Sequence, residues 1–199
     1  KSELAANVDE AVEVAGRIGY PVVLKIASPD ILHKTDVGGV KVGLNNASDV
    51  RDAFDLIIYR AQRYVPDARI WGCLVQEMVP TNGLEVLVGM SKDPQFGPLV
   101  TFGLGGILVE ALKDVTFRVA PFGREDAEKM LEEIRARSLL KGVRGRPPAD
   151  TEAAVDTLLR INQLVTDFPE IVEMDINPLM VYERGQGAIA LDMRLVLKA

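Results

Sequence analysis

The chain has 199 residues, enough for one large domain or two small lobes, and its 48% hydrophobic and 26% charged residues are ordinary for a globular protein. A net charge of −6 argues against a nucleic-acid-binding surface, and the sequence contains no uncharged apolar run of about 20 residues that would predict a membrane span. The single cysteine, Cys73, excludes an intrachain disulfide and fits a cytoplasmic location. The abrupt start at Lys1 suggests an internal fragment of a longer protein.

Helical and strand-like segments alternate along the chain. The spacing of apolar residues predicts helices at residues 7–18, 48–63, 124–137 and 151–168. Apolar runs predict strands at residues 22–26, 40–44, 69–79, 85–90, 99–102 and 115–120, with further strands in residues 171–197 around a tight turn at Arg184 and Gly185. Residues 103–106 are expected to form a flexible loop. Because many strands adjoin through turns, the pattern favours an α+β fold, with a hinge near residues 80–83 that divides two lobes.

Residues 20–44 hold an unusual combination of residue types. Lys25 interrupts an apolar strand. Such a lysine usually packs its aliphatic stem against the protein while its ammonium reaches water. The functional alternative is that its ammonium binds a nucleotide phosphate. Gly38 and Gly39 separate two strands, either as a simple hairpin turn or as a place where backbone N–H groups approach phosphate oxygens. The sequence does not match the P-loop pattern.

His33 is the only histidine, and it lies in a polar stretch beside Lys34 and close to Asp36. A lone histidine in such surroundings is usually an ordinary surface residue. The functional alternative is a nucleophile that accepts a phosphoryl group. Metal binding is a poor alternative, because there is no second histidine and only one cysteine.

A metal pair is predicted near the end of the chain. Asp175 and Asn177 alternate on one face of a strand, in EMDINPL. If the closing hairpin is symmetric about Arg184 and Gly185, Asn177 lies directly across from Asp192. Two oxygen donors at that spacing suit Mg²⁺, which takes few protein ligands together with substrate phosphates. The alternative is an ordinary strand end with an exposed aspartate.

The segment before the expected hinge offers weaker indications. Residues 76–79 (QEMV) end a strand where backbone groups could pair with an adenine edge, and Glu85 could accept hydrogen bonds from ribose hydroxyls. The alternative is an edge strand with solvated polar side chains.

Four blocks in order resemble one known family: GYPVVLKIASPDILHKTDVGGVKVGL, LVQEMVPTNGLEVLVG, DPQFGPLVTFGLGGILVEALKDVTFRVAP and EMDINPLMV. They are similar to the ATP-grasp domain of ADP-forming acyl-CoA synthetases (acetate–CoA ligases), which are relatives of succinyl-CoA synthetase. The resemblance covers nearly the whole chain. It implies an ATP-grasp fold of two α+β lobes with the nucleotide site between them: residues 1–79, incomplete at the N-terminus, and residues 80–199.

The resemblance also implies roles for particular residues. The nucleotide, ATP or ADP with Mg²⁺, would be held by Lys25 on the phosphates, Glu77 and Val79 at the adenine and Glu85 near the ribose, with Gly38 and Gly39 as candidate phosphate contacts. Asn177 and Asp192 would bind Mg²⁺. His33 would be a transient phosphoryl carrier assisted by Asp175, and Arg118 would offset charge on the moving phosphoryl group.

The chain lacks the CoA-binding and CoA-ligase domains of the family, which are the expected partners and would bring the acyl substrate and CoA. The first hypothesis is therefore the ATP-grasp part of an acid–CoA ligase, unable to complete the reaction alone. The alternative is a catalytically silent regulatory module, as found in GNAT-type protein acetyltransferases. The presence of Lys25, His33, Asn177 and Asp192 favours activity.

Overall fold

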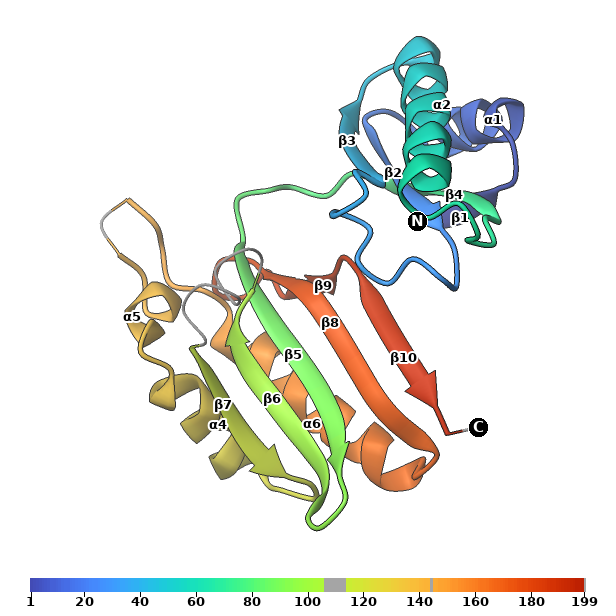
Figure 1. Cartoon of the computed structure of the whole chain (residues 1–199). Coiled ribbons are helices and arrows are strands. Elements are labelled where there is room, and N and C mark those ends of the chain that lie inside the picture. The colour runs from blue at the N-terminus through green and yellow to red at the C-terminus, as the bar shows by residue number, and fades with distance from the viewer. Residues whose placement is uncertain (106–113, 144, 199) are drawn as a thin grey trace. The chain divides into compact units, whose positions relative to one another are not determined.

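The computed structural model describes residues 1–105, 114–143 and 145–198, and it divides into two compact units, Lys1–Pro80 and Thr81–Ala199. Each unit combines an antiparallel sheet with helices, so the expected α+β class is confirmed (Figure 1). No helix within the described residues is long and apolar enough to cross a bilayer.

The first unit is a four-stranded sheet covered by two helices. Its elements are β1 (Ser2–Ala5), α1 (Val8–Ile18), β2 (Val22–Ala27), β3 (Val40–Leu44), α2 (Ala47–Tyr64) and β4 (Gly72–Glu77), with the strands in the order β1-β4-β2-β3. Helix α1 begins as the sequence predicts, because the Asn7 side chain accepts from the Glu10 N–H at 3.0 Å and donates to the Glu10 carboxylate at 2.6 Å. Val22, Leu24 and Ile26 belong to the core that the sheet shares with both helices, so the alternate residues of β2 occupy the opposite face.

The second unit is a six-stranded sheet with helices on one face (Figure 1). Its elements are β5 (Leu84–Asp93), β6 (Gly97–Leu104), β7 (Val115–Val119), α4 (Arg124–Glu133), α5 (Arg137–Leu140), α6 (Thr151–Asp167), β8 (Ile171–Val181), β9 (Ala188–Ala190) and β10 (Met193–Leu197). The strand order is β10-β8-β5-β6-β7, with β9 also paired to β8. Val88, Phe102 and Ile176 belong to a core shared with α4 and α6, so the other face of the sheet carries their neighbours in sequence.

Two sequence predictions in this unit are wrong. Gly103 is not in a loop: it extends β6 and pairs with Leu87 on one side and Val115 on the other. A Cβ at Gly103 would lie 2.6 Å from the Asp114 carbonyl oxygen, so glycine is needed where the two strands approach closely. Gly106 of the same motif lies outside the described residues.

The helix predicted at residues 124–137 ends early, at Glu133. The Asp114 carboxylate accepts the Arg135 N–H at 2.7 Å and the Ala136 N–H at 2.8 Å, and Ile134 is extended. A side chain from another segment thus takes the donors that a continued helix would have used. The strand predicted at residues 69–79 is also shorter, since the Arg69 N–H donates to Asp30 before the strand begins at Gly72.

Candidate functional site

Lys25 lies in β2 with only 8% of the residue exposed. Its strand neighbours in register are Val40 on β3 and Leu74 on β4. Because Leu24 and Ile26 pack toward the helices, Lys25 is placed on the face of the sheet that the helices do not cover. A lysine so deeply buried is unusual, and this favours the functional interpretation over a lysine that merely reaches water.

His33 lies in the segment between β2 and β3, and it is exposed. The segment turns tightly after it, since the His33 carbonyl accepts from the Asp36 N–H at 3.2 Å and the Thr35 carbonyl accepts from the Gly38 N–H at 2.9 Å. The His33 backbone is therefore part of a local turn, while its side chain is exposed. This arrangement suits a group that must reach a reaction partner.

The start of the same segment is fixed by Asp30. Its carboxylate accepts three hydrogen bonds from Arg69: from the backbone N at 2.8 Å, Nε at 2.9 Å and Nη2 at 2.7 Å. Hydrogen bonds from Arg69 lower the pKa of Asp30 to about 2, and the bonds from its side chain contribute more than the bond from its backbone N–H. The chain therefore leaves β2 through a fixed point three residues before His33.

Gly38 and Gly39 return the segment to the sheet. Gly38 has φ +63°, and a Cβ on Gly39 would lie 2.5 Å from Cγ2 of Ile26 and 2.9 Å from the Lys34 carbonyl oxygen. Both positions need glycine for packing and turn geometry, which is sufficient to explain them. The phosphate contact predicted for these glycines stays a prediction.

Glu77 ends β4, and its side chain is about half exposed. The Met78 N–H donates to the Pro21 carbonyl at 3.3 Å. Val79 follows outside any strand, at the end of the first unit, and its contact with adenine stays a prediction.

The second unit pairs Asn177 with Asp192, as the symmetric hairpin predicts. Val181 lies opposite Ala188 and Leu179 opposite Ala190, and the same register continues where Met193 lies opposite Ile176. Between these pairs the Asn177 N–H donates to the Asp192 carbonyl at 3.2 Å. The predicted register is therefore confirmed for the backbone.

Asp175 occupies the sheet face that α4 and α6 leave uncovered, because Met174 and Ile176 on either side belong to the core. It lies in register with Gly89 on β5, and a Cβ on Gly89 would be 3.7 Å from Oδ1 of Asp175. Glu85 precedes the core residue Val86 on β5, so it shares this uncovered face.

Arg118 is not brought to this face. It lies in register with the core residue Val100, and its guanidinium donates to Glu133 of α4 at 2.7 Å and lies 3.8 Å from Asp126. Hydrogen bonding to Glu133 raises the pKa of Arg118 above its ordinary value. The cation that sequence reasoning missed is Arg194, which lies directly across from Asp175 and pairs with Glu173. The sequence contains an indication of this position, because Arg194 follows Asp192 by two residues and alternate residues of an extended chain share one face.

The candidate oxygen ligands suit a magnesium ion better than a metal ion that is coordinated by protein side chains alone. Within the described residues there is no group of three or more His, Cys, Asp or Glu side chains that could hold a metal. As metal ligands, Asn177 on β8 and Asp192, which directly precedes β10, would supply an amide and a carboxylate oxygen from paired segments of backbone. A pair of hard donors of this kind matches a cation that completes its shell with water and phosphate oxygens.

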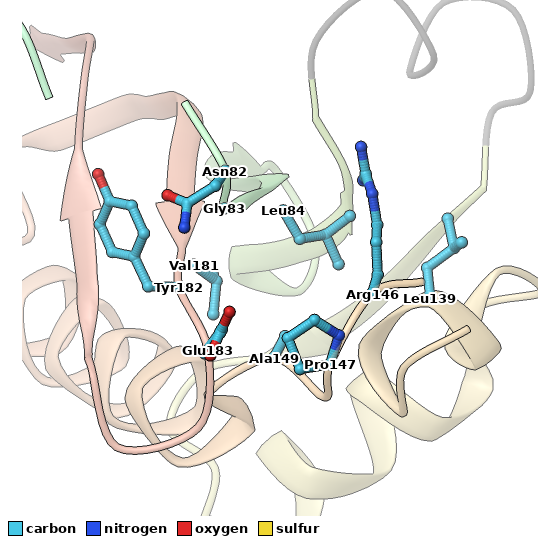
Figure 2. Close-up of a pocket in the computed structure, with 10 residues that line it drawn as sticks. All are labelled: Asn82, Gly83, Leu84, Leu139, Arg146, Pro147, Ala149, Val181, Tyr182 and Glu183. Atoms are coloured by element: carbon cyan, nitrogen blue, oxygen red, sulfur yellow. The ribbon is translucent and has the colours of Figure 1, made fainter. Parts of the chain in front are cut away.

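Two pockets described in the second unit contain none of the predicted residues. One, of about 40 Å³, has only room for water and lies between the start of β5, the end of β8 and residues 146–149 (Figure 2). Another, of about 280 Å³, lies among α4, α5 and α6. The candidate residues instead occupy the sheet faces and the loop that carries His33.

Comparison with known proteins gives the family. A family model described as ATP-grasp domain matches residues 1–197. The chain belongs to the ATP-grasp domain family, as the resemblance implied, and its fold class is confirmed.

Among the curated relatives, the chain is 51% identical over 195 residues to acetate–CoA ligase (ADP-forming) I subunit beta of Pyrococcus furiosus, covering 98% of this chain and 83% of that subunit. It is 50% identical over 194 residues to acetate–CoA ligase (ADP-forming) I of Archaeoglobus fulgidus, covering 98% of this chain and only 28% of that protein. The chain thus corresponds to most of a separate subunit and to about a quarter of a single-chain ligase.

A similar solved structure is the dinucleotide forming acetyl-coenzyme A synthetase 1 of Ca. Korarchaeum cryptofilum. In complex with coenzyme A, Ca-AMPCP and HgCl⁺, it is 48% identical with a TM-score of 0.94, covering 100% of this chain and 85% of that one. The same synthetase was also solved in complex with coenzyme A and Mg-AMPPCP, with a phosphohistidine segment pointing towards the nucleotide binding site. That structure is 45% identical with a TM-score of 0.80, covering 98% of this chain and 84% of that one.

Proposed function

We propose that this chain is the ATP-binding, Mg²⁺-dependent phosphoryl-transfer part of an ADP-forming acid–CoA ligase of the acetyl-CoA type. The observation that carries the proposal is the 51% identity, over 98% of the chain, with the β subunit of an ADP-forming acetate–CoA ligase. The alternative, a silent module of a GNAT-type acetyltransferase, finds no support in these relatives.

In this proposal each unit supplies part of the nucleotide site. From the first unit come Lys25 for the phosphates, the Gly38-Gly39 turn beside them, and Glu77 and Val79 for the adenine. From the second unit come Glu85 for the ribose and the Asn177–Asp192 pair for Mg²⁺. The buried position of Lys25 and the backbone pairing of Asn177 with Asp192 support these assignments. The proposal keeps the two lobes that the resemblance implies, residues 1–79 and 80–199.

His33 is the proposed nucleophile. A ring nitrogen forms a bond to the γ-phosphorus of ATP as the bond to the bridging oxygen of ADP breaks, so the departing electron pair stays on ADP. Mg²⁺, when bound, offsets charge on the phosphates, and the Lys25 ammonium adds to this. Asp175 would orient the imidazole and stabilise its charged form. The proposal gives Arg118 no contact with phosphate, because it binds Glu133 on the other face.

The rest of the reaction belongs to partners. The chain spans 28% of the single-chain relative, so we assign the CoA-binding and CoA-ligase functions, the acyl substrate and CoA to other domains or another subunit. Those parts would take the phosphoryl group from His33. The proposal places the assembly in the cytoplasm, which the single cysteine of the sequence fits.

The test is labelling of this chain with ATP carrying a radioactive γ-phosphate in the presence of Mg²⁺. Because His33 is the only histidine, a phosphohistidine, which is acid-labile and base-stable, can form only there. We expect such label on the wild type and none on His33→Asn. Asp192→Ala should slow labelling on the order of a hundredfold, through loss of a metal ligand.

The control variant is Lys129→Ala, which removes an exposed cation paired with Glu125 on α4 and should label as the wild type does. Nucleotide binding without label, or label that survives in His33→Asn, would count against the proposal.

A further inference from the structure

The turn after β8 is bound to the start of α6 by a single carboxylate. Asp150 is 7% exposed, and its Oδ2 accepts the N–H groups of Gly185 and Gly187, both at 2.9 Å. Its Oδ1 accepts the Ala153 N–H at 3.2 Å, which caps α6. The Gly187 N–H, followed by those of Ala153 and Gly185, holds the pKa of Asp150 below its ordinary value. Asp150 is therefore ionised near neutral pH and joins two elements.

Backbone hydrogen bonds reinforce this junction. The Asp150 N–H donates to the Tyr182 carbonyl at 2.8 Å, and the Arg184 N–H donates to the Pro148 carbonyl at 3.1 Å. Ala149 forms an antiparallel bridge with Glu183, and Figure 2 shows these two residues on adjoining segments. Residues 148–150 thus run alongside the turn and fix where it begins.

This turn determines the register of the hairpin beyond it. The Tyr182 N–H donates to the Gly187 carbonyl at 3.0 Å, and the pairs that follow keep one register up to Asn177 and Asp192. Because side chains alternate along a strand, a slip of one residue would move Asp192 to the opposite face from its present one. Keeping an amide and a carboxylate oxygen side by side therefore depends on the turn.

We propose that Asp150 is a positioning residue for the Asn177–Asp192 magnesium pair, which it serves by fixing residues 182–187. It does not touch the ion. The inference rests on the proposed function, since it takes the pair as the metal site. Partners that hydrogen-bond directly to metal ligands commonly change metal affinity by 10–100-fold, and a residue that acts through the hairpin should reach the lower end of that range.

The decisive variant is Asp150→Ser. Serine remains a good N-cap for α6, but its single short side-chain oxygen cannot also accept from Gly185 and Gly187. We expect the dissociation constant of Mn²⁺, measured by electron paramagnetic resonance with ADP present, to rise about tenfold. The Mg²⁺ concentration for half-maximal His33 labelling should rise equally, with the KM for ATP unchanged at saturating Mg²⁺.

Amide hydrogen exchange supplies a readout that is independent of the metal. The N–H groups of Asn177 and Leu191 donate across the hairpin, to Asp192 and Pro178, and should exchange faster in Asp150→Ser. The control is Asn162→Ala, which loses two hydrogen bonds with Phe122 in the same unit and should leave the metal requirement unchanged.

Unchanged exchange, or faster exchange with unchanged Mn²⁺ affinity, in Asp150→Ser would overturn the inference. A wild type that binds Mn²⁺ with ADP but takes no label would instead contradict the proposed phosphoryl transfer alone, so the two failures are distinguishable.

Discussion

Asp30 and Arg69 are a pair of exposed residues that hold the chain just before His33. The guanidinium and backbone N–H of Arg69 surround both carboxylate oxygens, three residues before His33. An exposed ion pair contributes little to global stability, but a bidentate one with a backbone bond has a defined geometry. Its importance here is local, because it fixes where the His33 segment leaves the sheet.

The pair predicts a pH dependence. The pKa of Asp30, about 2 in the folded chain, is lower than the ordinary unfolded value of about 3.9, so its stabilisation is complete above pH 4 and is lost as pH falls toward 2. At pH 3 we expect Asp30 to be largely ionised in the wild type and more protonated in Arg69→Met, which keeps the backbone N–H bond but loses the guanidinium. Carboxyl carbon chemical shifts in NMR spectra measure this difference.

Glu125, which pairs with Lys129 in the second unit, is the internal reference and should titrate alike in both proteins. Equal protonation of Asp30 with and without the Arg69 guanidinium would contradict the assignment.

At the scale of elements, the connection from β2 to β3 depends on space as much as on turn geometry. Gly39 lies against Ile26 and the Lys34 carbonyl, so the strand that carries Lys25 and the loop that carries His33 meet at this glycine. Gly16 in α1 has no heavy atom within 4 Å of the position that a Cβ would occupy. The two glycines therefore differ in what a methyl group would meet.

Alanine substitution should separate them. Gly39→Ala is expected to destabilise the protein by about 1–3 kcal/mol through overpacking. Gly16→Ala, in the last turn of α1, should stabilise it by at most about 0.5–1 kcal/mol. Urea unfolding measures both free energies, and a Gly39→Ala protein as stable as Gly16→Ala would show that the close contact is relaxed at no cost.

At the scale of the whole molecule, each unit has its own hydrophobic core. One core extends from Ala5 to Val75 and the other from Val86 to Val181. Cys73, the only cysteine, is buried in the first core, and burial raises the pKa of its thiol to about 12. Its reaction with a thiol reagent therefore reports opening of the first unit alone.

Core substitutions should reveal this independence. Ile57→Ala in the first core should lower the free energy of unfolding by about 2–5 kcal/mol. It should also increase the rate at which a thiol reagent labels Cys73 at neutral pH. Phe102→Ala, in the second core, should lower the free energy of unfolding of its own unit by about 3–5 kcal/mol and leave the labelling rate of Cys73 unchanged. Equal acceleration by both substitutions would mean that the units unfold as one.

Local pattern predicted much of this fold, for reasons visible in particular elements. Apolar spacing located α2 and α6 to within one residue at each end, and strands 22–26 and 40–44 appear almost as expected. Hairpin symmetry predicted that Asn177 lies across from Asp192. The short strand β1 was missed, because four residues of mixed polarity carry no periodic signal.

The sequence by itself determined the α+β class, the helix starts and the pairing of Asn177 with Asp192, because side-chain period, capping and hairpin register depend on near neighbours. Tertiary structure alone decided that Arg118 faces α4, that Asp114 ends α4, and that Asp150 binds the turn at residues 185–187. Each of these contacts joins groups at least 15 residues apart, and such partners are chosen by sheet order and helix packing, which local spacing does not encode.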